Sequence, residues 1–263
     1  MPDTNFSLSA NSADYIFEKV FTVQSYETDQ RGFARPVALL NYLQSAAGEH
    51  AALLGVAVAN LRKSGHTWVL SRLHLAMDRY PRGGGTVRLR TWPAARDRLF
   101  TVRDFELFDI DAVLIGRATT SWAVLNLKTR RPVRLNDVLS AYPINPERAL
   151  NDVFSTLPVL EKSEYELHLP VLRGDLDINR HVNNTVYAGW ALETVPEVID
   201  GGFSLASIEI AFRAEALYGD TIAARTLRTE DAGCYIHRID NGLDGRELAR
   251  IRTRWTLLEK THH

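Results

Sequence analysis

The segment from Asp175 to Asn184 brings together side chains that a hydrolytic reaction needs. Within it, Asp177, Asn179 and His181 are spaced two residues apart. In an extended segment this spacing places all three side chains on one face, because successive side chains point to opposite sides of the chain. A carboxylate can accept a proton, whereas an amide and an imidazole can donate hydrogen bonds. We therefore expect a hydrolytic site in this segment.

The elements that must position this segment occur twice in the chain. Asp29 and the residues after it align with Asp177 and its successors at an offset of 148 (177 − 29). Further on, Trp122 aligns with Trp255 at an offset of 133 (255 − 122), so the connections are shorter in the second copy. A period this long indicates a duplicated domain rather than a solenoid, whose repeats span ~20–50 residues.

The two copies differ at the residues that could do chemistry. Both keep the aspartate, but the first copy has Arg31 and Phe33 where the second has Asn179 and His181. We therefore expect the second copy to hold the catalytic residues and the first copy to shape the pocket.

Each copy is predicted to contain one helix followed by antiparallel strands. The first helix is expected to begin at Pro36, since proline suits the first helical position, and to stop near Gly55. The second is expected to be capped by Asn183 or Asn184. Alternating apolar residues and hairpin-like turns predict the strands. These are Trp68–Asp78, Thr86–Trp92, Leu99–Asp109, Val113–Leu125, Ser204–Phe212, Thr221–Leu227, Tyr235–Asp240 and Glu247–Leu258.

The composition is that of a globular protein. The 263 residues are 45% hydrophobic and carry a formal net charge of −1, so no overall field favours nucleic acid. No apolar run reaches the ~18–20 residues of a membrane span, and we expect no membrane insertion. The single Cys234 and a polar start without the features of a secretory signal predict a cytoplasmic protein. The histidines lack the spacing of a metal site, and we expect neither a metal nor another cofactor.

Several short motifs, in their order and spacing, resemble the family of acyl-acyl-carrier-protein (acyl-ACP) thioesterases. The resemblance runs from about Phe21 to Leu258. Its motifs are Trp68-Val-Leu-Ser-Arg72, Asp78-Arg-Tyr-Pro81, the segment from Asp175 to Asn184, Gly189-Trp-Ala-Leu-Glu193 and Phe212-Arg-Ala-Glu215.

The resemblance implies an α+β fold, the double hotdog. It consists of two tandem modules, each an antiparallel β-sheet wrapped around a central α-helix. The expected organisation is a flexible leader at 1–14, an N-terminal hotdog domain with the acyl-chain pocket at 15–140, a linker at 141–162 and a catalytic C-terminal hotdog domain at 163–263.

The resemblance also implies the residues of the site. The catalytic aspartate, asparagine, histidine and glutamate of the family map onto Asp177, Asn179, His181 and Glu215. Many plant members have a cysteine after that glutamate, but this chain has Ala216, so no cysteine nucleophile is available there. The residues expected to contact substrate are Leu43, Trp68, Val69 and Asn184.

The implied activity is hydrolysis of a fatty acyl-ACP thioester to a free fatty acid and holo-ACP. The expected partner is acyl carrier protein bearing a fatty acyl-phosphopantetheine, and arginines such as Arg88, Arg90 and Arg130 are candidates for docking it. Water activated by Glu215 is the favoured mechanism; Asp177 as the base, or carboxylate attack through an anhydride, are alternatives. An acyl-CoA thioesterase and a catalytically silent acyl- or ACP-binding module also stay open, as does a homodimer.

Overall fold

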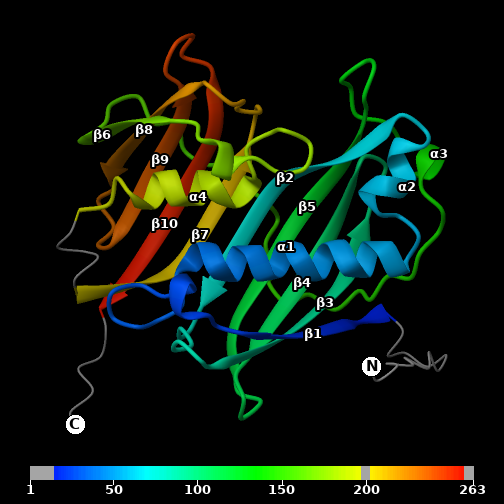
Figure 1. Ribbon diagram of the computed structural model, residues 1–263, viewed down its shortest axis with the longest axis horizontal. Coiled ribbons are helices and arrows are strands. Elements are labelled where there is room, and N and C mark those ends of the chain that lie inside the picture. Colours follow the sequence, from blue (N-terminus) through cyan, green and yellow to red (C-terminus); the bar gives the residue numbers. More distant parts are fainter. Residues whose placement is uncertain (1–14, 197–201, 258–263) are drawn as a thin grey trace.

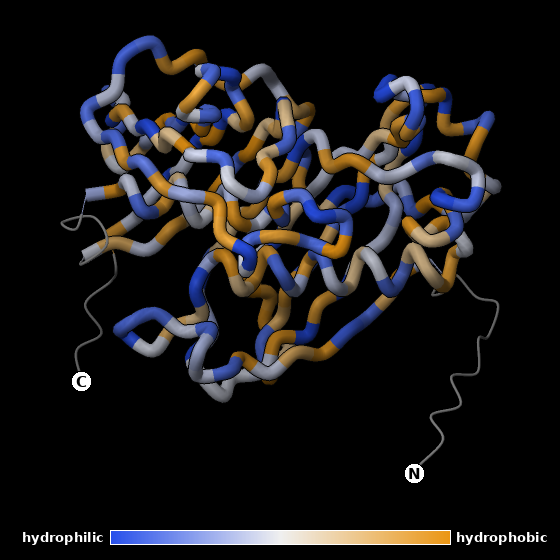
Figure 2. Tube along the Cα trace, turned by 45° about the horizontal axis from the view of Figure 1, so that its top comes forward, coloured by the Kyte–Doolittle hydropathy of each residue, from blue (hydrophilic) through white to orange (hydrophobic). Residues whose placement is uncertain are grey.

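Ten strands pair into one antiparallel sheet (Figure 1). Hydrophobic and hydrophilic residues are interspersed along the chain in Figure 2, as expected where one face of a sheet packs on the core. The computed structural model describes residues 15–196 and 202–257, so the predicted leader at 1–14 lies outside the described residues. Within the described part of the chain, no helix is long and apolar enough to cross a membrane.

In each half a helix is followed by four strands, as predicted, but an edge strand precedes that helix and the first half has two further short helices. The elements of the first half are β1 (Phe17–Thr22), α1 (Pro36–Leu53), α2 (Val58–Arg62), β2 (His66–Met77), β3 (Thr86–Arg96), β4 (Phe100–Phe108), β5 (Leu114–Asn126) and α3 (Leu135–Val138). Those of the second half are β6 (Tyr165–Pro170), α4 (Asn184–Leu192), β7 (Phe203–Phe212), β8 (Thr221–Arg228), β9 (Cys234–Asn241) and β10 (Glu247–Leu257).

The two halves of the sheet join through β2 and β7. The strand order is β1-β3-β4-β5-β2-β7-β10-β9-β8-β6, so the second half repeats the first in reverse order across the junction. The pairing is antiparallel, with Arg72 opposite Ala211 and Ala76 opposite Ser207. The two predicted modules therefore share one continuous sheet, joined by a strand pair that was not named from the sequence.

The helices α1 and α4 lie on the same face of the sheet and contact each other (Figure 1). Proline at the first position starts α1 at Pro36, and a left-handed Gly55, with φ of +72°, follows its end. Asn183 caps α4, because its side chain accepts a hydrogen bond from the backbone N–H of Thr185. The starts predicted for both helices are confirmed. However, α1 has 18 residues and α4 only 9, so the second half covers less of its sheet.

The eight strands predicted from the sequence are present with shifts of one to a few residues at their ends. The edge strands β1 and β6 were not predicted. Every residue of β6 except Leu169 is exposed, and alternate residues of β1 are also exposed, so neither strand has the apolar pattern of an interior strand.

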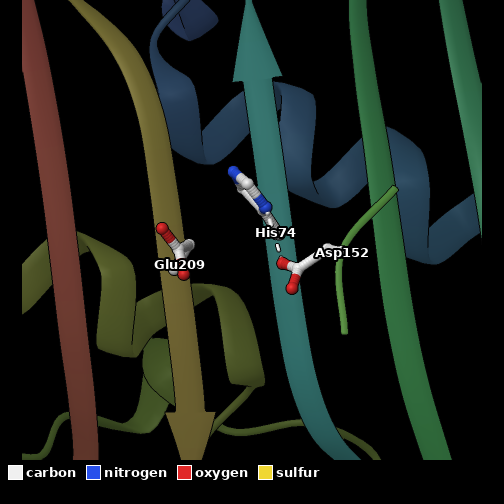
Figure 3. Close-up of side chains that lie close together, drawn as sticks. All are labelled: His74, Asp152 and Glu209. Atoms are coloured by element: carbon white, nitrogen blue, oxygen red, sulfur yellow. Dashed lines mark hydrogen bonds and ion pairs between the residues drawn. The ribbon is translucent and has the colours of Figure 1, made fainter. Parts of the chain in front are cut away.

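Asp152, in the segment 141–162, lies with His74 and Glu209 on the face of the sheet opposite α1 (Figure 3). Arg148 donates a hydrogen bond from Nε to Oδ2 of the buried Asp104 over 2.8 Å. Farther along, Oδ2 of Asp152 lies 2.7 Å from Nδ1 of His74 on β2. These contacts fix the connection between the two halves against the outside of the sheet.

Candidate active site

The candidate site is built around the carboxylate of Asp177, in the loop before α4. Oδ1 accepts hydrogen bonds from the backbone N–H groups of Asn179, over 2.7 Å, and His181, over 3.2 Å. Oδ2 accepts a hydrogen bond from Nδ2 of Asn179 over 2.9 Å. The Asp177 side chain therefore holds both the loop backbone and the Asn179 amide.

This loop is a turn, so the expectation of an extended segment with alternating faces is wrong. The backbone N–H of Asp177 bonds the carbonyl oxygen of His181, and Arg180 has a left-handed φ of +64°. An aspartate that caps successive N–H groups stabilises such a turn. The three side chains are gathered by folding around Asp177 rather than by the period of a strand.

Glu215 approaches the loop from the segment that follows β7. Its Oε1 lies 3.4 Å from Nδ1 of His181, and its Oε2 forms an ion pair with the Arg130 guanidinium. An isolated bridge between His181 and Leu217 joins the two segments. The structure thus brings together all four residues that the resemblance assigned to catalysis.

The Tyr187 side chain on α4 forms hydrogen bonds with the backbone on both sides of Glu215. Its hydroxyl accepts a hydrogen bond from the backbone N–H of Ala216 over 2.9 Å and donates to the carbonyl oxygen of Ala214 over 3.4 Å. Burial raises the pKa of the Tyr187 hydroxyl to about 12. Ala216 is fully buried. The residues on either side of Glu215 are therefore fixed to the helix.

A cavity of about 1360 Å³ opens beside these residues. Its walls come from the C-terminal half of α1, from α2 and from strand ends of the first half, and its polar edge comes from the loop before α4 and the segment around Glu215. Trp68, Val69 and Asn184 line it, as expected for substrate contacts. Leu43 does not. It is 2% exposed and packs in the core, where it borders only a small void.

The first copy has an equivalent loop around Asp29, but this loop lacks the amide and the imidazole of the second copy. Oδ1 of Asp29 accepts the backbone N–H groups of Arg31 and Phe33 over 2.9 and 3.0 Å, which repeats the pattern around Asp177. Tyr80 occupies the position equivalent to Glu215 at an offset of 135 (215 − 80), and its hydroxyl donates to the carbonyl oxygen of Leu205 over 2.9 Å. Thus the aligned copies are structurally equivalent, and only the second has an amide, an imidazole and a second carboxylate.

Two arginines of the site come from the first half and were not predicted as site residues. Arg62, at the end of α2, contacts Oδ1 of Asn179, while Arg130, after β5, contacts Glu215. Both line the cavity. Arg130 was considered only for carrier docking, and no local motif marks Arg62. Each partner lies far away in the sequence, so short-range spacing carries no signal for either contact.

One group of side chains outside this site has the geometry of metal ligands. His74, Asp152 and Glu209 offer ligand atoms within 4.8 Å of one another, on the sheet face opposite α1 (Figure 3). However, Arg252 binds both oxygens of Glu209, at 2.6 Å and 2.8 Å from Nη2. A guanidinium occupies the position that a cation would need, so this group is better explained as a polar contact between the 141–162 segment and the sheet.

Comparisons with known proteins agree with this architecture. Residues 14–142 match the acyl-ACP thioesterase N-terminal domain, and residues 160–257 match the acyl-ACP thioesterase C-terminal domain. The chain is 30% identical to oleoyl-acyl carrier protein thioesterase 1 of Arabidopsis thaliana, over 91% of this chain and 75% of that protein. It is 29% identical to the dodecanoyl-[acyl-carrier-protein] hydrolase of Cinnamomum camphora, over 91% of this chain and 67% of that protein.

Two solved structures extend the agreement to three dimensions. The 12:0-ACP thioesterase from Umbellularia californica superposes with a TM-score of 0.83 at 26% identity and covers 96% of this chain and 100% of that chain. An acyl-ACP thioesterase from Bacteroides thetaiotaomicron gives a TM-score of 0.81 at 25% identity, over 94% and 100%.

A duplicated sheet-and-helix module with one polar site defines a hydrolase of the double hotdog fold, as predicted. Within that class, the chain belongs to the acyl-ACP thioesterase family. The resemblance noted in the sequence is confirmed.

Proposed function

We propose that this protein hydrolyses fatty acyl-ACP thioesters to free fatty acids and holo-ACP. The observation that carries the proposal is the convergence of Asn179, His181 and Glu215 at the edge of a cavity of about 1360 Å³. The relatives named above are oleoyl- and dodecanoyl-ACP thioesterases, which supports a fatty acyl group as the substrate.

The hydrogen bonds favour Glu215 over Asp177 as the general base. Both oxygens of Asp177 already accept hydrogen bonds from the loop, so this carboxylate acts as a support. Glu215 has a side chain 36% exposed, which leaves it accessible to water. A carboxylate within hydrogen-bond reach of the attacking water is the first requirement for a base.

The reaction then follows from these positions. A water molecule attacks the thioester carbonyl carbon while Glu215 takes its proton. Asn179 and His181 supply hydrogen bonds to the oxyanion and to the Glu215 carboxylate. When the carbon–sulfur bond breaks, its electron pair leaves with the sulfur, which receives the proton from Glu215. The products are the free acid and the carrier thiol.

The test measures thiol release from acyl-ACPs and matching acyl-CoAs with chains of about C8 to C18, since pocket depth selects among chain lengths. We expect turnover of acyl-ACP, with a maximum at one chain length. Turnover of CoA esters alone would contradict the carrier as partner. If neither series is hydrolysed while acyl-ACP still binds, the protein is a silent binding module.

A further inference from the structure

The amide of Asn179 is held from two sides by groups of opposite charge. Nδ2 donates to Oδ2 of Asp177 over 2.9 Å, and Oδ1 accepts from Nη2 of Arg62. Asp177 belongs to the same loop as Asn179, whereas Arg62 belongs to α2 of the first half. The two halves of the molecule therefore meet at this side chain.

These contacts allow only one orientation of the amide. A carboxylate oxygen can only accept a hydrogen bond, and a guanidinium can only donate. Rotating the amide by a half turn would place Nδ2 against Arg62 and Oδ1 against Asp177. A donor would then face a donor, and an acceptor would face an acceptor. The hydrogen-bonding partners alone therefore assign the nitrogen and the oxygen.

This orientation determines what Asn179 offers to a ligand. Its oxygen is occupied by Arg62, and one of its two N–H groups is occupied by Asp177. The second N–H has no partner among the residues that the structure describes, and Asn179 lines the cavity. Asn179 can therefore donate to a developing oxyanion through this second N–H, while its oxygen is directed toward Arg62.

Packing holds Arg62 where this contact requires it. The preceding residue, Leu61, is 3% exposed and lies in a small core with Val56 and Val124. The side chain of Arg62 itself is exposed and makes no other hydrogen bond or ion pair within the described ranges. The hydrogen bond to Asn179 is thus the one polar contact of the Arg62 side chain among the described residues.

We propose that Arg62 is a positioning residue that fixes Asn179 as an oxyanion donor, so that the active site is shared between the two halves. This inference rests on the proposed thioesterase activity for its kinetic test. It also makes a prediction about the free protein that needs no substrate.

The kinetic test is a double-mutant cycle of Arg62→Ala and Asn179→Ala, assayed on acyl-ACP. Loss of a well-placed donor or of its orientation lowers kcat, and we expect Arg62→Ala to lower kcat roughly 10- to 100-fold with little change in KM. In the Asn179→Ala background, Arg62→Ala should have no further effect, since residues that act as one unit are not additive. Arg62→Lys should recover part of kcat because an ammonium also donates to Oδ1.

Two controls separate positioning from charge at the entrance. Lys63→Ala removes the adjacent exposed cation and should keep wild-type kcat and KM. An acyl-N-acetylcysteamine thioester has no phosphate, and the kcat defect of Arg62→Ala should persist on it. Additive losses in the cycle, or a KM defect seen only with acyl-ACP, would overturn the inference and indicate that Arg62 binds an anionic group of the carrier arm.

The substrate-free test follows the side-chain amide of Asn179 by ¹⁵N NMR. We expect Arg62→Ala to shift both Asn179 amide protons toward the values of a free carboxamide, while Lys63→Ala leaves them in place. Unchanged Asn179 resonances would contradict the inference even if the enzyme is active. Conversely, a shift in a protein that hydrolyses no thioester would refute the proposed function and leave the Arg62 contact intact.

Discussion

At the scale of single residues, hydrogen bonding separates the two carboxylates of the site. Asp177 uses both oxygens to hold the loop and the Asn179 amide. Among the residues that the structure describes, the Glu215 carboxylate pairs with the side chains of His181 and Arg130, and Glu215 borders the cavity. The same chemical group therefore holds the loop backbone in one position and borders the cavity in the other.

Replacing Glu215 with glutamine removes the base and keeps the size of the side chain. We expect Glu215→Gln to lower kcat by about 10²- to 10⁴-fold, the usual contribution of general base catalysis, without lowering the free energy of unfolding. The matched control is Glu230→Gln, the same change at an exposed position in the turn before β9. Steady-state kinetics on acyl-ACP would contradict the assignment if both variants keep wild-type kcat.

The candidate site was predictable from sequence only where its residues lie in local motifs. Asp177, Asn179 and His181 form one loop, and the motif ending at Glu215 adds the fourth residue. Arg62 lies 117 residues from its partner Asn179, so nothing in the spacing connects them. Leu43 does not line the large cavity. Helical periodicity marks a buried face but does not show which part of that face borders a cavity.

At the scale of elements, α4 and the segment after β7 act together through Tyr187. The helix presents this hydroxyl to the backbone on either side of Glu215. A buried N–H without a partner is unfavourable, so the hydroxyl determines how this segment lies on the helix.

Removing that hydroxyl should affect both stability and activity. We expect Tyr187→Phe to lower the free energy of unfolding by about 1–3 kcal/mol, because the N–H of the buried Ala216 loses its partner. It should also lower kcat, since Glu215 is held less tightly. Tyr218→Phe is the control, because Tyr218 is exposed and its ring lies against the Arg173 guanidinium. Urea titration and kinetics measure both effects; equal behaviour of the two variants would argue against this role.

Sequence patterns predicted the interior elements better than the edges. Pro36, Gly55 and Asn183 mark helix ends through their own backbone chemistry, and these positions are confirmed. The strands β1 and β6 each pair with one neighbour only and carry exposed residues, so their sequences lack a strong apolar period. The junction of β2 with β7 depends on how the two halves meet, which no local pattern encodes.

At the scale of the whole molecule, two buried histidines link stability to pH. His237 is fully buried between the hydroxyls of Thr226 and Thr253, and burial lowers its pKa to about 3. His50 has its pKa lowered to about 3 by burial and by the nearby Arg103. Between pH 6.5 and pH 3 these histidines are protonated in the unfolded chain but neutral in the folded protein. Stability is therefore present above pH 6.5 and falls as pH decreases through this range.

Each such histidine contributes up to about 1.4 kcal/mol per pH unit to the slope of unfolding free energy against pH. We expect His237→Gln to reduce this slope between about pH 6.5 and pH 5 by about that amount, since one proton uptake is lost. His50→Gln should act in the same direction. Denaturant titrations over this range measure the slope. An unchanged slope in both variants would mean that the folded protein already takes up these protons.

The junction of β2 and β7 also bears on how such a site can evolve. In a symmetric dimer of identical chains, every substitution appears in both subunits, so both sites change together. Here the two halves of one sheet are encoded by different parts of one chain. Arg31 and Tyr80 occupy the positions in the first half that are equivalent to Asn179 and Glu215 in the second. A mutation in one half is not imposed on the other. The two halves can therefore differ, and Arg62 and Arg130 of the first half contact Asn179 and Glu215 of the second.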